Sequence, residues 1–146
     1  MRVVLDASVL ISAFKENEPE HSTSADFLEA AVAHSVTLCS PALLFPEIAG
    51  AFARPARNPD YAARAIREMR ALLEIEIYPL DADLALNAEA IAQNFLLRGA
   101  DAFYVALARR LGAALITLDR EMLERAMPAA EALTPAAWLA GIKEKE

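Results

Sequence analysis

The chain has 146 residues, of which 56% are hydrophobic and 24% charged, and its formal net charge is −7. This composition excludes a disordered chain, and no apolar run approaches the roughly 18 residues of a membrane span. The negative charge argues against binding nucleic acid by long-range attraction, but leaves room for a nuclease whose metal ions and arginines contact phosphates. The single cysteine, Cys39, cannot form an internal disulfide, so a cytoplasmic location is expected.

Short apolar segments alternate with helical patterns along the chain. The length fits one domain, expected to span residues 1–142, with a charged tail at 143–146. Strands are predicted at residues 3–5, 36–39, 75–78, 114–118 and 132–133. Helices are predicted at residues 24–32, from about 45, and at 59–73, 81–97, 101–111, 119–127 and 135–142. This alternation indicates an α/β fold in which helices cover both faces of a parallel sheet.

Several helix ends carry recognisable capping residues. The hydroxyls of Ser22, Thr23 and Ser24 precede the first predicted helix, whose apolar stripe includes Val32. Asp81 is a predicted N-cap, and Gly99 is predicted to terminate the helix that Asp81 begins.

Two predicted strands are each followed by an aspartate. Asp6 comes directly after the apolar run of the first strand, and Asp119 follows ALITL near the end of the chain. Because ligands bind beyond the carboxyl ends of parallel strands, these two carboxylates can face one crevice. The alternative for each is helix N-capping, a common role of aspartate.

Two further acids interrupt apolar helices. Asp101 lies in the first turn of a helix whose neighbouring residues are mostly apolar, which favours its burial. Glu47 is the single acid in LLFPEIAGAF. Helix-dipole complementarity explains Asp101 equally well, and a narrow exposed stripe explains Glu47.

A cluster of these four carboxylates requires a cation. Two carboxylates at about 4 Å repel by about 4 kcal/mol at an effective dielectric near 20. No histidine or cysteine adjoins the acids in sequence, so the ligands would be oxygens, which favours Mg²⁺ or Mn²⁺ over zinc.

Four segments together resemble the PIN-domain family, and within it the VapC-like ribonuclease toxins of toxin–antitoxin pairs. They are VVLDASVLISAF, SPALLFPEIAGAF, RGADAFYVALARRLG and ALITLDREM, and they occur in this order over nearly the whole chain. Pro46, directly before Glu47, departs from the family pattern without removing an acid.

The resemblance implies a three-layer α/β/α sandwich with a mainly parallel sheet and metal-dependent endonucleolytic cleavage of RNA. It implies that Asp6, Glu47, Asp101 and Asp119 are the catalytic residues, with Asp6, Asp101 and Asp119 as metal ligands. It also implies a cognate antitoxin and a homodimer, for which residues 45–52 and 59–73 are candidate interface segments. Whether one or two ions bind stays open.

Two hydroxyls and three arginines are candidates for supporting roles. Ser8 and Thr117 each lie two residues from a site acid and can orient a carboxylate or a water. Local backbone hydrogen bonding is the alternative for both. The candidate RNA-contacting residues are Arg54, Arg57 and Arg98, which can also be ordinary solvated or helix-end residues.

Two other functions fit parts of the sequence. A non-catalytic adaptor with the same fold would bind protein or RNA without cleaving it. An aspartyl phosphotransferase would use Asp6 as the nucleophile, but such enzymes usually carry a second acid two residues on, where this chain has Ser8.

Overall fold

The computed structural model describes residues 1–146 and contains a five-stranded sheet with eight helices. The strands are β1 (Arg2–Leu5), β2 (Thr37–Pro41), β3 (Ile75–Tyr78), β4 (Ala114–Ile116) and β5 (Ala132–Leu133). The helices are α1 (Ala7–Phe14), α2 (His21–Ala33), α3 (Leu44–Ala56), α4 (Pro59–Leu72), α5 (Ala82–Phe95), α6 (Gly99–Leu111), α7 (Arg120–Arg125) and α8 (Pro135–Lys143). All strand pairs are parallel, which confirms the predicted α/β/α fold class.

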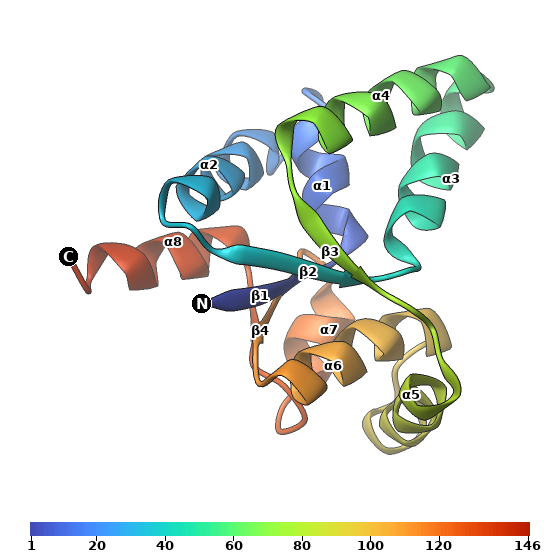
Figure 1. Ribbon diagram of the computed structural model, residues 1–146, viewed down its shortest axis with the longest axis vertical. Helices are drawn as coiled ribbons and strands as arrows, with labels where there is room; N and C mark the ends of the chain where they lie inside the picture. Colours follow the sequence, from blue (N-terminus) through green and yellow to red (C-terminus); the bar gives the residue numbers. More distant parts are fainter.

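Helices cover both sides of the sheet (Figure 1), and each side has its own apolar core. Helices α1 to α4 and α8 pack on one face against Val3, Leu5 and Leu38, while α5, α6 and α7 pack on the other against Val4, Cys39 and Leu115. Alternate residues of β1 therefore enter opposite cores, as the two-residue period of a strand requires. Since both faces are covered, the central strands are continuous apolar runs.

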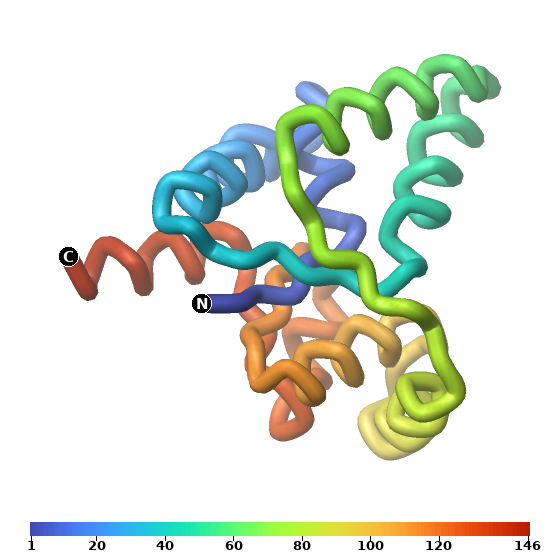
Figure 2. Tube along the Cα trace, in the orientation of Figure 1, coloured from blue at the N-terminus to red at the C-terminus, as the bar shows by residue number.

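The strand order, β3-β2-β1-β4-β5, places a change of direction between β1 and β4. The chain leaves β1 and β2 through helices on one face, and it reaches β4 and β5 through helices on the other (Figure 2). In open parallel sheets, such a switch point leaves a crevice beyond the carboxyl ends of the two central strands. Asp6 follows β1 and Thr117 follows β4, so both stand at this point.

Several predicted boundaries were wrong. Helix α2 begins at His21, so the three hydroxyl residues before position 25 lie within it and none caps it; Val32 is 58% exposed rather than buried. Helix α5 ends at Phe95 because Leu96 adopts the left-handed conformation (φ 56°) that the sequence predicted for Gly99. Gly99 instead opens α6.

The predicted N-cap at Asp81 is confirmed, because its side chain accepts a hydrogen bond from the Leu84 amide at 2.8 Å. Cys39 is fully buried. None of the eight helices has the length and apolar character needed to cross a membrane.

Candidate active site

Asp6 is a buried carboxylate held by two hydroxyl groups. It occupies the N-cap position of α1, but its side chain makes no capping hydrogen bond. Its Oδ2 instead accepts hydrogen bonds from Ser8 Oγ at 2.6 Å and from Thr117 Oγ1 at 2.9 Å. The capping alternative therefore does not explain this aspartate, which is only 5% exposed.

The same two hydroxyls also tie β4 to the start of α1. Ser8 Oγ accepts a hydrogen bond from the Leu118 amide at 3.0 Å, and Thr117 Oγ1 accepts one from the Asp119 amide at 2.9 Å. Each hydroxyl thus donates a hydrogen bond to Asp6 and accepts one from a backbone N–H. This fixes the direction of both O–H groups and holds the carboxylate at the switch point of the sheet.

Asp101 and Asp119 share one arginine. Arg98, the N-cap residue of α6, donates from Nε to Asp101 Oδ2 at 3.0 Å, and its second contact is with Asp119 Oδ2 at 3.5 Å. Asp119 also caps α7, because its Oδ1 accepts a hydrogen bond from the Met122 amide at 3.0 Å. The capping interpretation is thus correct for Asp119, and its second carboxylate oxygen faces Arg98.

Glu47 reaches the site from α3 and is held by Tyr104. The Tyr104 hydroxyl donates a hydrogen bond to Glu47 Oε1, which connects α3 to α6. Tyr104 is fully buried and lies three residues after Asp101, on the same side of α6. Tyr104 was not predicted from the sequence; the available signal was a hydroxyl-bearing side chain within an apolar helix, three positions from the candidate site acid Asp101.

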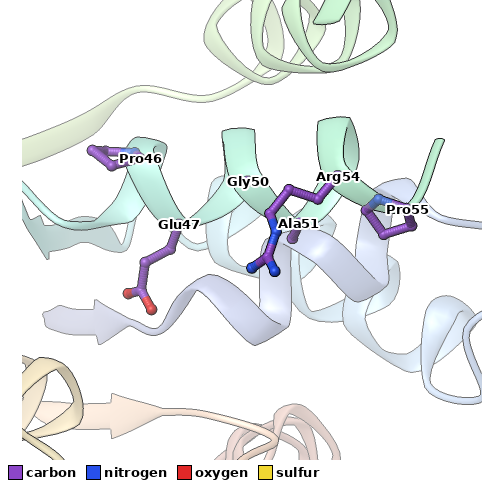
Figure 3. A pocket seen from close by; sticks show the side chains of 6 residues that line it. All are labelled: Pro46, Glu47, Gly50, Ala51, Arg54 and Pro55. Carbon is purple, nitrogen blue, oxygen red and sulfur yellow. The ribbon is translucent and has the colours of Figure 1, made fainter. Parts of the chain in front are cut away.

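A surface hollow of about 710 Å³ lies along α3 beside Glu47. Pro46, Gly50, Ala51, Arg54 and Pro55 form the rest of its lining, and Figure 3 shows Glu47 and Arg54 extending from the same side of the helix. Arg54 is therefore placed near a site acid. Arg57, by contrast, is the C-cap of α3 in the left-handed conformation (φ 50°), and it does not line the hollow.

The acids influence one another electrostatically. Burial raises the pKa of Asp6 to about 6; the hydroxyls of Ser8 and Thr117 oppose this rise, and the charges of Glu47 and Asp101 add to it. Burial also raises the pKa of Asp101, an effect that the Arg98 guanidinium opposes and the Asp119 charge increases. These mutual effects link all four acids through one region.

The four carboxylates do not form a ready-made metal cage. As the side chains stand, no group of three or more histidines, cysteines, aspartates or glutamates is arranged to hold an ion. Asp6 and Glu47 accept hydrogen bonds from hydroxyl groups, and Asp101 and Asp119 form ion pairs with Arg98. The donor set nevertheless fits Mg²⁺ or Mn²⁺, since it consists of carboxylate oxygens. A cation would offset the burial cost of the ionised Asp6 and the smaller repulsion from Glu47 and Asp101, which together raise the Asp6 pKa.

Comparison with solved structures identifies the fold. A VapBC2 complex from Rickettsia felis bound to promoter DNA aligns with a TM-score of 0.72 at 13% identity, covering 92% of this chain and 98% of the other. PAE2754 from Pyrobaculum aerophilum gives 0.69 at 20% identity, covering 99% and 96%. VapC20 from Mycobacterium tuberculosis, described as a sarcin-ricin loop cleaving toxin, gives 0.67 at 16% identity, covering 81% and 90%.

The sequence itself places the chain in a family. No curated protein matches it. The PIN domain model, however, matches residues 3–127, a span that includes all four acids as well as Ser8 and Thr117. The chain therefore belongs to the PIN domain family.

Proposed function

We propose that this chain is a Mg²⁺- or Mn²⁺-dependent endoribonuclease and the toxin of a toxin–antitoxin pair. The observation that supports the proposal is the set of links between four acids from four separate segments of a PIN-domain chain: the charges of Glu47 and Asp101 act on Asp6, and Arg98 pairs with both Asp101 and Asp119. A structural role alone would not require buried Asp6 to be ionised beside two other acids, because that arrangement costs free energy.

The proposed chemistry is hydrolysis of an RNA phosphodiester bond. A bound Mg²⁺ would lower the pKa of a coordinated water and neutralise charge that develops on the phosphate. Asp6 and Asp101 would hold the ion most directly, and Asp119 would bind it directly or through water. Glu47, on the rim beside the hollow, would orient the attacking water or accept its proton. Ser8 and Thr117 would keep Asp6 in place.

Arginines would supply the substrate contacts that the net charge does not. Arg54 extends on the same side of α3 as Glu47, so it is placed to contact an RNA phosphate near that acid (Figure 3). Arg57 and Arg98 are exposed at the ends of α3 and α6, and both remain proposed RNA contacts. A protein of net charge −7 with a local cationic rim would bind RNA weakly at long range and depend on contacts at the site.

An antitoxin is the proposed protein partner. Several similar structures are toxin–antitoxin complexes, including one from Klebsiella pneumoniae. An acidic site suits an inhibitor with a basic side chain, because opposite potentials favour association.

A homodimer through α3 and α4 is a further proposal. Phe45 lies under the Arg70 guanidinium at 4.0 Å and Phe52 is buried, whereas Leu72 is 64% exposed and available for an interface.

The test is cleavage of single-stranded RNA by the purified chain. We expect cleavage with Mg²⁺ or Mn²⁺, none with EDTA, and products with 5′-phosphate and 3′-hydroxyl ends. Asp6→Asn and Asp101→Asn should each lower the rate by about 100-fold or more. The matched control is Asp26→Asn, since Asp26 is exposed on α2 and distant from these segments in the sequence.

Three outcomes would contradict the proposal. They are cleavage that survives EDTA, cleavage that survives either site substitution, and a protein that binds no Mn²⁺ and cuts no RNA. The last outcome would favour a PIN-fold adaptor, and a phosphorylated Asp6 would favour a phosphotransferase.

A further inference from the structure

Arg98 is the only cationic side chain that forms an ion pair with any of the four site acids. Its guanidinium lies 3.0 Å from Asp101 Oδ2 and 3.5 Å from Asp119 Oδ2. The remaining ion pairs of the molecule involve other acids. One positive charge therefore stands between two of the acids that are proposed to bind a metal ion.

The three partners differ greatly in exposure. The Arg98 side chain is 72% exposed, whereas those of Asp101 and Asp119 are 8% and 25% exposed. Arg98 is the residue directly before α6, and its side chain makes no capping hydrogen bond. The guanidinium can therefore move into solvent without disturbing a core, while the carboxylates stay fixed at the start of α6 and α7.

A guanidinium and a divalent ion need the same oxygens. A planar guanidinium fork engages carboxylate lone pairs through N–H groups, and Mg²⁺ or Mn²⁺ binds those lone pairs directly. Asp101 Oδ2 and Asp119 Oδ2 therefore cannot fully bond the guanidinium and a divalent ion at the same time.

We infer that Arg98 is a tethered counter-cation that pairs with Asp101 and Asp119 in the metal-free protein and is displaced when a divalent ion binds. The inference rests on the proposed metal site. Arg98 acts through the ligands, so it is a positioning residue that sets metal affinity. It keeps a buried acid paired in the free protein, and it weakens metal binding by competition and by its own positive charge.

The test is calorimetric titration of Mn²⁺ into the wild-type protein and into Arg98→Gln. Removing the competitor should tighten Mn²⁺ binding by about three- to tenfold, as expected for a partly exposed pair of contacts. Arg98→Lys keeps the charge but lacks the fork, so its affinity should lie between those of the two proteins. The control is Arg120→Gln, which removes the same charge one residue from Asp119, where Arg120 is 90% exposed and pairs with Glu124.

The outcomes separate this inference from the proposed function. Tighter Mn²⁺ binding by Arg98→Gln but not by Arg120→Gln supports the inference, even if the wild-type protein binds Mn²⁺ too weakly to measure. A purely structural Arg98 would lower the melting temperature and leave the Mn²⁺ dissociation constant unchanged, which would overturn the inference alone. If neither protein binds Mn²⁺ and the wild type cuts no RNA, the inference and the proposed function both fail.

Discussion

The two halves of the candidate site hold their carboxylates by different means. Asp6 and Glu47 accept hydrogen bonds from neutral hydroxyls, whereas Asp101 and Asp119 share the charged guanidinium of Arg98. A neutral donor orients a carboxylate but leaves its charge in place, while a guanidinium also neutralises it. The first half is therefore where negative charge stays unbalanced. Burial raises the pKa of Asp6 to about 6, only the two hydroxyls oppose this rise, and the charges of Glu47 and Asp101 add to it.

The largest expected effect is on stability at neutral pH. Asp6→Asn should stabilise the protein at pH 7 by about 3 kcal/mol, because the pKa of Asp6 rises from 3.8 to about 6 on folding. The folded state binds this proton more tightly than the unfolded state does. Burial of Asp6 therefore costs no stability below about pH 4, where the carboxyl is protonated in both the folded and the unfolded state. Stability is lost as the pH rises through about 6.

Urea unfolding of the wild type and Asp6→Asn between pH 4 and pH 7 measures this difference. Asp26→Asn, which removes an exposed charge, should show no such trend. A variant that is less stable than the wild type at pH 7, or a stability difference that does not change with pH, would contradict the claim that burying the ionised Asp6 carboxylate lowers stability.

The next effect concerns the hydroxyl that joins Asp6 to β4. Thr117→Val keeps the shape of the side chain and removes two hydrogen bonds, one to Asp6 and one from the Asp119 amide. We expect a loss of about 1–3 kcal/mol in stability and a pKa of Asp6 above its present value. A pH titration of the Asp6 carboxyl by NMR measures the second quantity.

Thr134→Val is the matched control. Thr134 caps α8 through a hydrogen bond from the Ala137 amide, so its loss should also destabilise the protein without moving the Asp6 titration. Equal titration curves for the two valine variants would mean that Thr117 does not stabilise the ionised Asp6.

The smallest expected effect separates Glu47 from its support. Tyr104→Phe removes one hydroxyl from a fully buried ring and with it the hydrogen bond to Glu47. Because Glu47 is itself half-exposed and can bond water instead, the loss in folding stability should be about 1 kcal/mol. RNA cleavage should fall several-fold, with little change in Mn²⁺ affinity, because Glu47 is proposed to act on the attacking water. The control is Tyr61→Phe, because the Tyr61 hydroxyl has no protein partner; this variant should change neither RNA cleavage nor Mn²⁺ affinity. A Tyr104→Phe enzyme as active as the wild type would show that Tyr104 does not position Glu47 for cleavage.

The sequence was sufficient for the parallel sheet, and it singled out four acids whose role in a site stays a prediction. Apolar runs predict buried strands, and an aspartate that directly follows such a run is easily recognised, as Asp6 and Asp119 are. Helix boundaries were harder, because Leu96 adopts a left-handed conformation that local rules reserve for glycine. The alternation of apolar segments gave no separate sign of α1, which begins directly after Asp6.

The partners of the acids could not be predicted in the same way. Tyr104 and Glu47 are 57 residues apart, and their hydrogen bond depends on how α3 and α6 meet at the end of the sheet. Thr117 and Asp6 are 111 residues apart and meet because β1 and β4 pair in register. For Arg98, the sequence left both a helix-end and a substrate role open, since spacing alone does not show which acids a long side chain contacts.

The central claim is that these acids bind a divalent ion at the switch point of the sheet. The most direct measurement is the anomalous signal of manganese in a crystal of the protein soaked in Mn²⁺ at neutral pH. We predict a peak in direct contact with carboxylate oxygens of Asp6 and Asp101, with the Arg98 guanidinium moved away from Asp101. A crystal in which manganese binds only elsewhere, while Arg98 still bridges Asp101 and Asp119, would contradict it.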